Sequence, residues 1–386
     1  MEFAFTEEQQ MIRETAEQFL ADHCDSAAVR RAMATEAGFE PELWHRIAGE
    51  MCWTAIHVPE AYGGLGLGYV EVVALMEQMG RRLLCAPYFS SICLGANALL
   101  LAAGEAQKER WLPAIADGSC RATLAWCDAS GRWDATGVSA TCVRDGEDYL
   151  LDGEYRYVVD GHTAGLLIVA ARTPGSAGTA GIGLFALPAD TAGVTRAWLP
   201  TMDQTRKLAT LRLERVRVPA AALLDAAATD AGAALANILA LATVALAAEQ
   251  AGGAQQILDI AVAYTRERQQ FGRTIASFQA IKHKAADMML KAEAARSAVY
   301  YAGCVATEAL AGGVPDAELA AAASLAKAYC SETYFFNAGT ALQLHGGVGF
   351  TWEYDVHLYF KRARASESFL GDAAEHRERL AAGLGL

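Results

Sequence analysis

Residues 266–288 read RERQQFGRTIASFQAIKHKAADM, and this stretch carries the most informative pattern of the chain. Arg268 and Arg273 lie on either side of a Phe271-Gly272 break. Arginine is the side chain best suited to bidentate contacts with phosphate. An ion-paired helix end is the plain alternative for the same residues. The composition of the stretch leaves both interpretations open.

A second stretch, residues 343–350, reads QLHGGVGF. Glycines at 346 and 347 allow the backbone to approach a ligand closely. His345 stands beside this glycine turn, where a histidine more often has a structural role than a catalytic one. Together the two stretches suggest a cofactor site built on helix ends.

The chain begins with a helical region. Thr6 followed by Gln9 predicts a capping box at the start of its first helix. Helical periodicity returns after residue 221 and predicts a helix over 226–268, which could also be two helices joined across Gly252-Gly253. Further helices are predicted over the ranges 42–51, 70–82, 92–103, 106–117, 278–311 and 315–339, and again from residue 354.

Between these regions lie short alternating runs that glycine, aspartate and proline separate, and they predict an antiparallel β domain. The chain is therefore expected to be α+β. We expect an N-terminal helical domain (1–120), a central antiparallel β domain (121–222) and a C-terminal helical bundle (223–386). The resemblance described below implies that this bundle is a four-helix bundle.

Composition narrows the function classes. A net charge of −13 disfavours a nucleic-acid binder. The cysteine count is nine, which is odd, and no Cys-x-x-Cys pair occurs, so we expect reduced thiols, no metal site and a cytoplasmic protein. The opening MEFAFTEEQQ lacks the features of a signal peptide. Residues 231–248 approach the length of a membrane span, but their alanine content favours a buried helix and no membrane span.

The motifs resemble those of the acyl-CoA dehydrogenase family. The resemblance rests on Arg268-x-x-Phe271-Gly272, on Phe278-Gln279-Ala280 with the later Ala286-Asp287-Met288, and on Gln343-x-x-Gly346-Gly347-x-Gly349-Phe350. The opening Phe5-Thr6-Glu7-Glu8-Gln9 and the segment Val58-Pro59-Glu60-x-Tyr62-Gly63-Gly64 are similar to the N-terminal domain of that family. The resemblance covers the whole chain in order.

This resemblance implies a particular architecture and chemistry. The family has helical, β and four-helix-bundle domains, binds FAD, and usually assembles as a dimer of dimers. Its reaction is the α,β-dehydrogenation of an acyl-CoA thioester, in which a carboxylate removes the α-proton while hydride passes to flavin N5. An electron-transfer flavoprotein is the common electron acceptor.

The resemblance also implies roles for individual residues. Arg268 would hold the FAD pyrophosphate and Phe271 would pack near the dinucleotide. The ADP half, bound across a subunit interface, would contact Gln279, Gln343, Gly346 and Gly347. In the β domain, the segments that would line the flavin contain Trp126, Asp128, Tyr157 and Val159.

The sequence departs from the family at the catalytic base. The usual base is a Glu followed by Gly, 23 residues after the second glycine of the Gly-Gly pair, and this chain has Leu370 there. Some members carry the Glu on the long helix before the arginine motif, and that position is Ala242. The family threonine near flavin N5 corresponds to Val159, and the matching aromatic residue is Tyr157 rather than Trp.

Three carboxylates are weak substitutes for the base. Glu249 lies about 10 Å along the helix from Ala242, which favours a buried or interface carboxylate. Glu367 and Asp372 flank Leu370 and could equally be solvated charges.

Three hypotheses remain open. The chain is a self-sufficient FAD-dependent dehydrogenase, as a homo-oligomer. Or it is the base-lacking subunit of a heterotetramer with a related base-carrying chain, as in actinobacterial α2β2 members linked to CoA esters of steroid side chains. Or it is a non-catalytic acyl-CoA-binding protein on the same scaffold.

Overall fold

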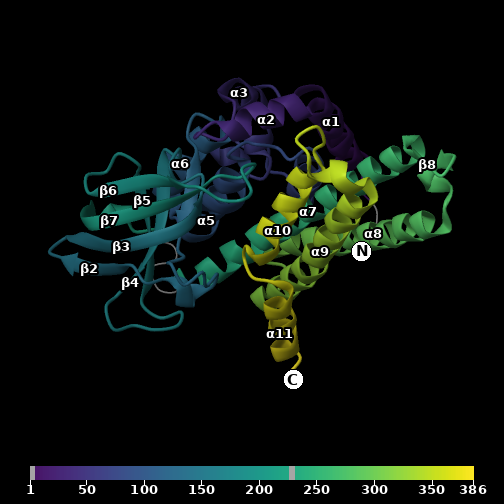
Figure 1. Cartoon of the computed structure of the whole chain (residues 1–386). Coiled ribbons are helices and arrows are strands. Elements are labelled where there is room, and N and C mark those ends of the chain that lie inside the picture. Colours follow the sequence, from purple (N-terminus) through teal and green to yellow (C-terminus); the bar gives the residue numbers. More distant parts are fainter. Residues whose placement is uncertain (1–4, 226–230) are drawn as a thin grey trace. The chain divides into compact units, whose positions relative to one another are not determined.

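The computed structural model describes residues 5–225 and 231–386, and the colours of Figure 1 show helices, then strands, then helices again along the chain. This arrangement confirms the predicted α+β class. The described residues form two compact units that alternate along the chain. The first unit contains the described residues up to Arg31, then Tyr69–Leu84 and Thr243–Leu386. The second contains Ala32–Gly68 and the described residues from Cys85 to Ala242.

The first unit is helical apart from one small hairpin. Its elements are the helices α1 (Glu7–His23), α4 (Tyr69–Arg81), α8 (Gln279–Leu310), α9 (Asp316–His345), α10 (Val356–Ser368) and α11 (Ala373–Gly383), the turns η6 (Ile275–Ser277) and η7 (Gly346–Phe350), and the strands β8 (Gln269–Gln270) and β9 (Arg273–Thr274). Two helices run from one unit into the other: α2 (Ser26–Ala34) and α7 (Ala231–Glu267).

The predicted capping box starts α1. Thr6 Oγ1 accepts from the Gln9 amide at 3.2 Å, and Gln9 Oε1 accepts from the Thr6 amide at 3.1 Å. The helix predicted over 226–268 is the single helix α7, although positions 226–230 lie outside the described residues. Gly252 and Gly253 therefore do not divide it.

Helix α9 is the centre of the first unit and packs against α8, α10 and α11. Asn337 on α9 is fully buried and donates to the carbonyls of Ala254 on α7 and Met288 on α8, at 3.1 and 3.2 Å. One buried side chain thereby ties three helices together. This packing fixes these stretches of α7, α8 and α9 relative to one another.

The second unit combines helices with a seven-stranded sheet. Its helices are α3 (Pro41–Gly49), α5 (Asn97–Ala102) and α6 (Glu105–Ala116), with a π-helix η3 (Phe89–Ala96) and the short turns η1 (Trp53–Ala55), η2 (Glu60–Tyr62), η4 (Ala135–Gly137) and η5 (Ala220–Ala222). Its strands are β1 (Ala122–Ala125), β2 (Thr141–Asp145), β3 (Asp148–Val159), β4 (Leu166–Arg172), β5 (Ile182–Pro188), β6 (Val194–Leu199) and β7 (Leu208–Pro219).

The sheet has the order β1-β4-β2-β3-β7-β6, with β5 on β4. It is mixed rather than purely antiparallel as predicted, because β4 pairs in parallel with β1 and β2. The chain between β1 and β4 is long enough to return to the same edge, and this allows a parallel pair that a tight hairpin cannot make. The remaining pairs are antiparallel, so the sequence pattern was correct for most of the sheet.

Helix α7 is long and apolar enough to cross a membrane by its length and composition alone. In the structure, 78% of its most apolar window is buried inside the protein, as in the core helix of a soluble protein. Burial by protein therefore accounts for the apolar run.

Candidate functional site

A strained hairpin joins α7 to α8. β8 pairs with β9, and the turn between them has Phe271 at φ 55° and Gly272 at φ 76°. Two successive positive φ values are typical of a two-residue hairpin turn, but a bulky residue seldom adopts one. Phe271 is 92% exposed, and its ring meets the edge of Phe278 at 6.2 Å. An exposed aromatic ring in a strained turn is typical of a functional site rather than of a folding element.

The predicted phosphate ligand lies on this hairpin. Arg268 is exposed, and its backbone pairs with Tyr264 and Ile275, at 2.9 Å in each case. Gln279 is the first residue of α8 and is also exposed. The guanidinium of Arg273 lies over the Phe278 ring at 4.0 Å. Arg268 and Gln279 are therefore held by a rigid backbone while their side chains reach solvent.

The second motif forms the end of α9. Gly346 has φ 64° and turns the chain out of the helix into η7. A Cβ added at Gly346 or Gly347 would meet no atom within 4 Å, so the backbone here faces open space. Gln343 is exposed, and its Oε1 accepts from Lys284 Nζ of α8 at 2.9 Å.

A stacked pair of rings joins the two motifs. His345 lies on Tyr264 of α7 with ring centroids 4.1 Å apart, and the Tyr354 ring meets both rings edge-on. His345 is buried and its Nδ1 donates to the Ala341 carbonyl at 2.8 Å; burial lowers its pKa. His345 thus fastens the end of α9 to the end of α7, which is the structural role expected for it.

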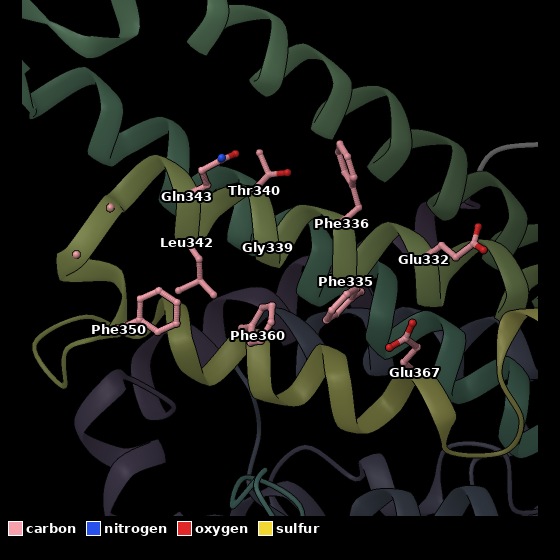
Figure 2. A pocket seen from close by; sticks show the side chains of 12 residues that line it. Glu332, Phe335, Phe336, Gly339, Thr340, Leu342, Gln343, Phe350, Phe360 and Glu367 are labelled. Carbon is pink, nitrogen blue, oxygen red and sulfur yellow. The ribbon is translucent and has the colours of Figure 1, made fainter.

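A groove of about 830 Å³ runs along α9 and α10, starting at the glycine turn that ends α9 (Figure 2). Gln343, Gly346 and Gly347 line one end of it, together with Phe350. Its middle is apolar, with Phe335, Phe336 and Phe360, and Glu332 and Glu367 stand at its other end. Three of the predicted ligands of the ADP half, Gln343, Gly346 and Gly347, therefore border a hollow surface, whereas Gln279 does not line it.

Two of the predicted flavin-lining residues of the second unit, Trp126 and Tyr157, form an aromatic cluster with Trp133. Trp126 is 2% exposed and its Nε1 donates to the Trp133 carbonyl at 3.2 Å. The Trp133 ring lies 6.0 Å from Trp126 and 5.9 Å from Tyr157. Tyr157 has φ 60° and lies at a register shift of β3. Asp128 accepts from the Ser130 amide at 2.8 Å.

Trp133 was not identified from the sequence. Its signal was a single large aromatic residue in an otherwise small and polar loop, residues 128–137. Val159 is buried, and its carbonyl accepts from Thr123 Oγ1 at 2.6 Å. Its isopropyl group offers no hydrogen-bond donor.

The two positions at which the resemblance implies a base hold apolar side chains. Leu370 is 2% exposed, and Ala242 is fully buried within α7. Leucine and alanine cannot accept a proton. The structure therefore gives neither position a base.

Each of the three substitute carboxylates already has a partner. Glu249 is buried and accepts from Arg362 Nε at 2.8 Å and Nη2 at 3.1 Å. Glu367 forms an ion pair with Arg364. Asp372 caps α11 by accepting from the Glu375 amide at 2.9 Å. The stretch from 369 to 372 is not helical.

Comparison with known proteins identifies the family. The model of the acyl-CoA dehydrogenase N-terminal domain matches residues 6–119, and that of the C-terminal domain matches residues 231–385. Acyl-CoA dehydrogenase IpdE2 of Mycobacterium tuberculosis is 34% identical over 374 residues, which cover 97% of this chain and 96% of the relative. The chain belongs to the acyl-CoA dehydrogenase family.

Two solved structures extend the similarity to the complete fold. Butyryl-CoA dehydrogenase from Megasphaera elsdenii superposes with a TM-score of 0.91 at 26% identity, covering all of both chains. A chain of the ChsE4-ChsE5 complex from Mycobacterium tuberculosis superposes with a TM-score of 0.88 at 26% identity, covering 100% of this chain and 99% of the other. The family is one of oxidoreductases, and its members are FAD-dependent.

Proposed function

We propose that this chain binds FAD and serves the α,β-dehydrogenation of an acyl-CoA thioester as a subunit without its own base. In this proposal it completes an FAD site together with a related chain that carries the glutamate. The observation that supports it most strongly is Leu370 at the position of the family base. The engagement of Glu249, Glu367 and Asp372 in other contacts adds to it.

The residues of the first unit fit the dinucleotide. Arg268 would pair with the pyrophosphate, since a guanidinium on a rigid hairpin suits two phosphate oxygens. Gln279 and Gln343 offer amide groups to neutral polar edges of the ADP half. Gly346 and Gly347 have the open backbone that close approach of a ligand requires. Phe271 would pack near the dinucleotide.

In the second unit, the aromatic cluster of Trp126, Trp133 and Tyr157 suits a planar ring. When bound, FAD supplies the redox step by accepting the hydride from the β-carbon. The chain would orient the cofactor and exclude water. Proton abstraction requires a carboxylate with a suitable pKa within reach of the α-carbon, and the partner chain would provide it.

Assembly and location are proposed with the function. A heterotetramer with a base-carrying chain would place its ADP contacts at a subunit boundary, as a dimer of dimers does in the family. A solved complex named for two components, ChsE4 and ChsE5, superposes on this chain and supports such an arrangement. We expect a cytoplasmic protein with an electron-transfer flavoprotein as acceptor.

A self-sufficient homo-oligomer is the second candidate. It is favoured by the similarity over 97% of the chain to a protein named acyl-CoA dehydrogenase IpdE2. The decisive difference is whether the purified chain, alone, is bleached by an acyl-CoA under anaerobic conditions. A chain that binds no flavin with any partner would instead be a non-catalytic acyl-CoA-binding protein.

The cofactor site is tested by replacing Arg268. Hydrogen bonds to charged groups contribute about 1.5–3 kcal/mol, so Arg268→Ala should weaken FAD binding by roughly 10- to 150-fold. FAD content is measured by the visible flavin absorbance of the chain, purified alone or with a co-expressed base-carrying chain. Arg212→Ala, which removes an exposed arginine of β7, is the control and should retain FAD. Full retention of FAD by Arg268→Ala contradicts the assignment.

A further inference from the structure

The turn after α10 has an unusual backbone. Leu370 has φ +62° and Gly371 has φ +102°, and Leu370 is only 2% exposed. A residue with a branched side chain seldom adopts positive φ. Such a conformation persists only where the surrounding structure determines it. The contacts of this turn therefore indicate what holds residue 370 in place.

Lys327 of α9 is the main contact. It is fully buried, and its Nζ lies 2.8 Å from Ser331 Oγ. The same Nζ lies 3.1, 3.0 and 2.9 Å from the backbone carbonyl oxygens of Ser366, Glu367 and Gly371. All four acceptors are neutral oxygens, and burial lowers the pKa of Lys327 to about 7. A buried amine that lies within hydrogen-bond distance of three carbonyls of one turn fixes the path of that turn.

Gln250 of α7 and His376 of α11 hold the turn from two other helices. Gln250 Nε2 donates to the Ser366 carbonyl at 3.0 Å. His376 Nε2 donates to the Leu370 carbonyl at 3.1 Å, and its Nδ1 accepts from Ser324 Oγ at 3.1 Å. Both side chains are buried. Carbonyls at both ends of the turn are thus bound by side chains from α7, α9 and α11.

We propose that Lys327, Gln250 and His376 are positioning residues that set the direction of the side chain at position 370. These three residues are called the cradle below. At residues 370 and 371 the cradle binds only backbone carbonyls, so its geometry does not depend on the side chain that stands there. This inference rests on the proposed function, because 370 is the position at which the family carries its base.

The cradle should position any side chain at residue 370 in the same direction, including one that replaces leucine. A glutamate introduced at 370 would leave the same backbone atoms to bind Lys327 and His376. Leu370→Glu should therefore place a carboxylate where the family has one, without reshaping the turn. Loss of the cradle should misplace that carboxylate while the cofactor and the thioester still bind.

Hydrogen exchange tests the cradle without any activity. The amides of Gly371, Glu375 and His376 are hydrogen-bonded within the turn and the first turn of α11. In Lys327→Met, exchange over residues 366–376 should be at least about tenfold faster than in the wild type. The control is Lys207→Met, since Lys207 is also buried and donates to the Met33 carbonyl at 2.7 Å in the second unit. Unchanged exchange over 366–376, or the same increase in the control, overturns the proposal.

A second variant covers the case in which Lys327→Met does not fold. His376→Phe removes only the contact to the Leu370 carbonyl and the one to Ser324. Exchange should again increase by at least about tenfold over residues 366–376 and remain unchanged elsewhere. Protection equal to that of the wild type contradicts the role of His376.

Kinetics distinguishes positioning from general support of the fold. In the Leu370→Glu background, adding Lys327→Met should lower kcat by about 10- to 100-fold, because a displaced base loses its near-attack geometry. KM and FAD content should stay within about twofold if binding is untouched. An unchanged kcat contradicts positioning. If Leu370→Glu shows no activity in either background, the pocket has lost more than its base, and the exchange measurement alone decides on the cradle; bleaching of the wild-type chain alone by an acyl-CoA is what contradicts the proposed function.

Discussion

The buried ion pair of Glu249 with Arg362 shows how a carboxylate near the expected site can be committed to structure. The side chains are 4% and 5% exposed, and the contact is bidentate. A charge buried in this way is neutralised by its partner, and removal of that partner leaves the other charge uncompensated. Counting residues along the sequence identified Leu370 and Ala242 as the positions that correspond to the family base. Only the structure could show that Glu249 has a partner 113 residues further on.

Glu249→Gln should therefore lower the free energy of unfolding by about 3–5 kcal/mol. Urea denaturation of the variant and of the wild type measures this difference. Glu332→Gln is the control, because Glu332 pairs with Arg377 in an exposed position and should cost at most about 1 kcal/mol. Equal effects in the two variants would show that the Glu249 pair is not buried.

His376 makes stability depend on pH. Burial, followed by the positive charges of Arg379 and Lys327, lowers its pKa to about 3, although Asp372 acts in the opposite direction. The unfolded chain protonates this histidine near pH 6.5, and the folded chain does not. The contribution of His376 to the free energy of unfolding is therefore complete above about pH 6.5. It is lost as the pH falls toward 3, with a slope of up to about 1.4 kcal/mol per pH unit.

Wild type should thus lose stability between about pH 6.5 and pH 5 more steeply than His376→Gln, which has no group that titrates there. Urea midpoints at several pH values measure both slopes. The pH dependence that other titrating groups contribute is common to the wild type and the variant, so it cancels when the two slopes are compared. Parallel pH profiles would contradict the buried, neutral state of His376.

Two glycines explain how closely α4 and α7 approach in the first unit. A Cβ at Gly252 would lie 1.8 Å from the Glu77 carbonyl oxygen, and one at Gly80 would lie 2.0 Å from the Glu249 carbonyl oxygen. Each glycine thus faces the backbone of the other helix. From the sequence, Gly252-Gly253 could equally be a break in the helix, because glycine weakens helices and also permits close packing. Helix α4, which packs against Gly252, distinguishes a helix break from close packing, and it is distant in the sequence.

Gly252→Ala should destabilise the protein by about 1–3 kcal/mol through overpacking against α4. Thermal or urea unfolding measures it. Gly339→Ala in α9 is the matched control, since its Cβ would meet no atom closer than 3.9 Å. That change should be neutral or stabilising by up to about 1 kcal/mol from helix propensity. A harmless Gly252→Ala would mean that the helices are further apart than the structure shows.

At the scale of the whole molecule, local patterns in the sequence predicted the order of helices and strands. The capping box, the helical periodicities and the strand runs depend on residues close in the chain. The parallel pairing of β4 with β1 and β2 was missed because it depends on chain topology. For the same reason, the sequence did not predict the stack of His345 on Tyr264 or the buried Lys327 beside Leu370.

An anaerobic titration of the purified chain with acyl-CoA thioesters tests most directly whether the chain lacks its own base. The panel should include short, long and steroid-side-chain esters, and Leu370→Glu serves as the positive comparison. We expect the wild-type chain alone to show no bleaching of flavin absorbance with any ester, while Leu370→Glu is bleached by at least one. Bleaching of the wild-type chain alone would show that it carries a functional base and would contradict the proposed function.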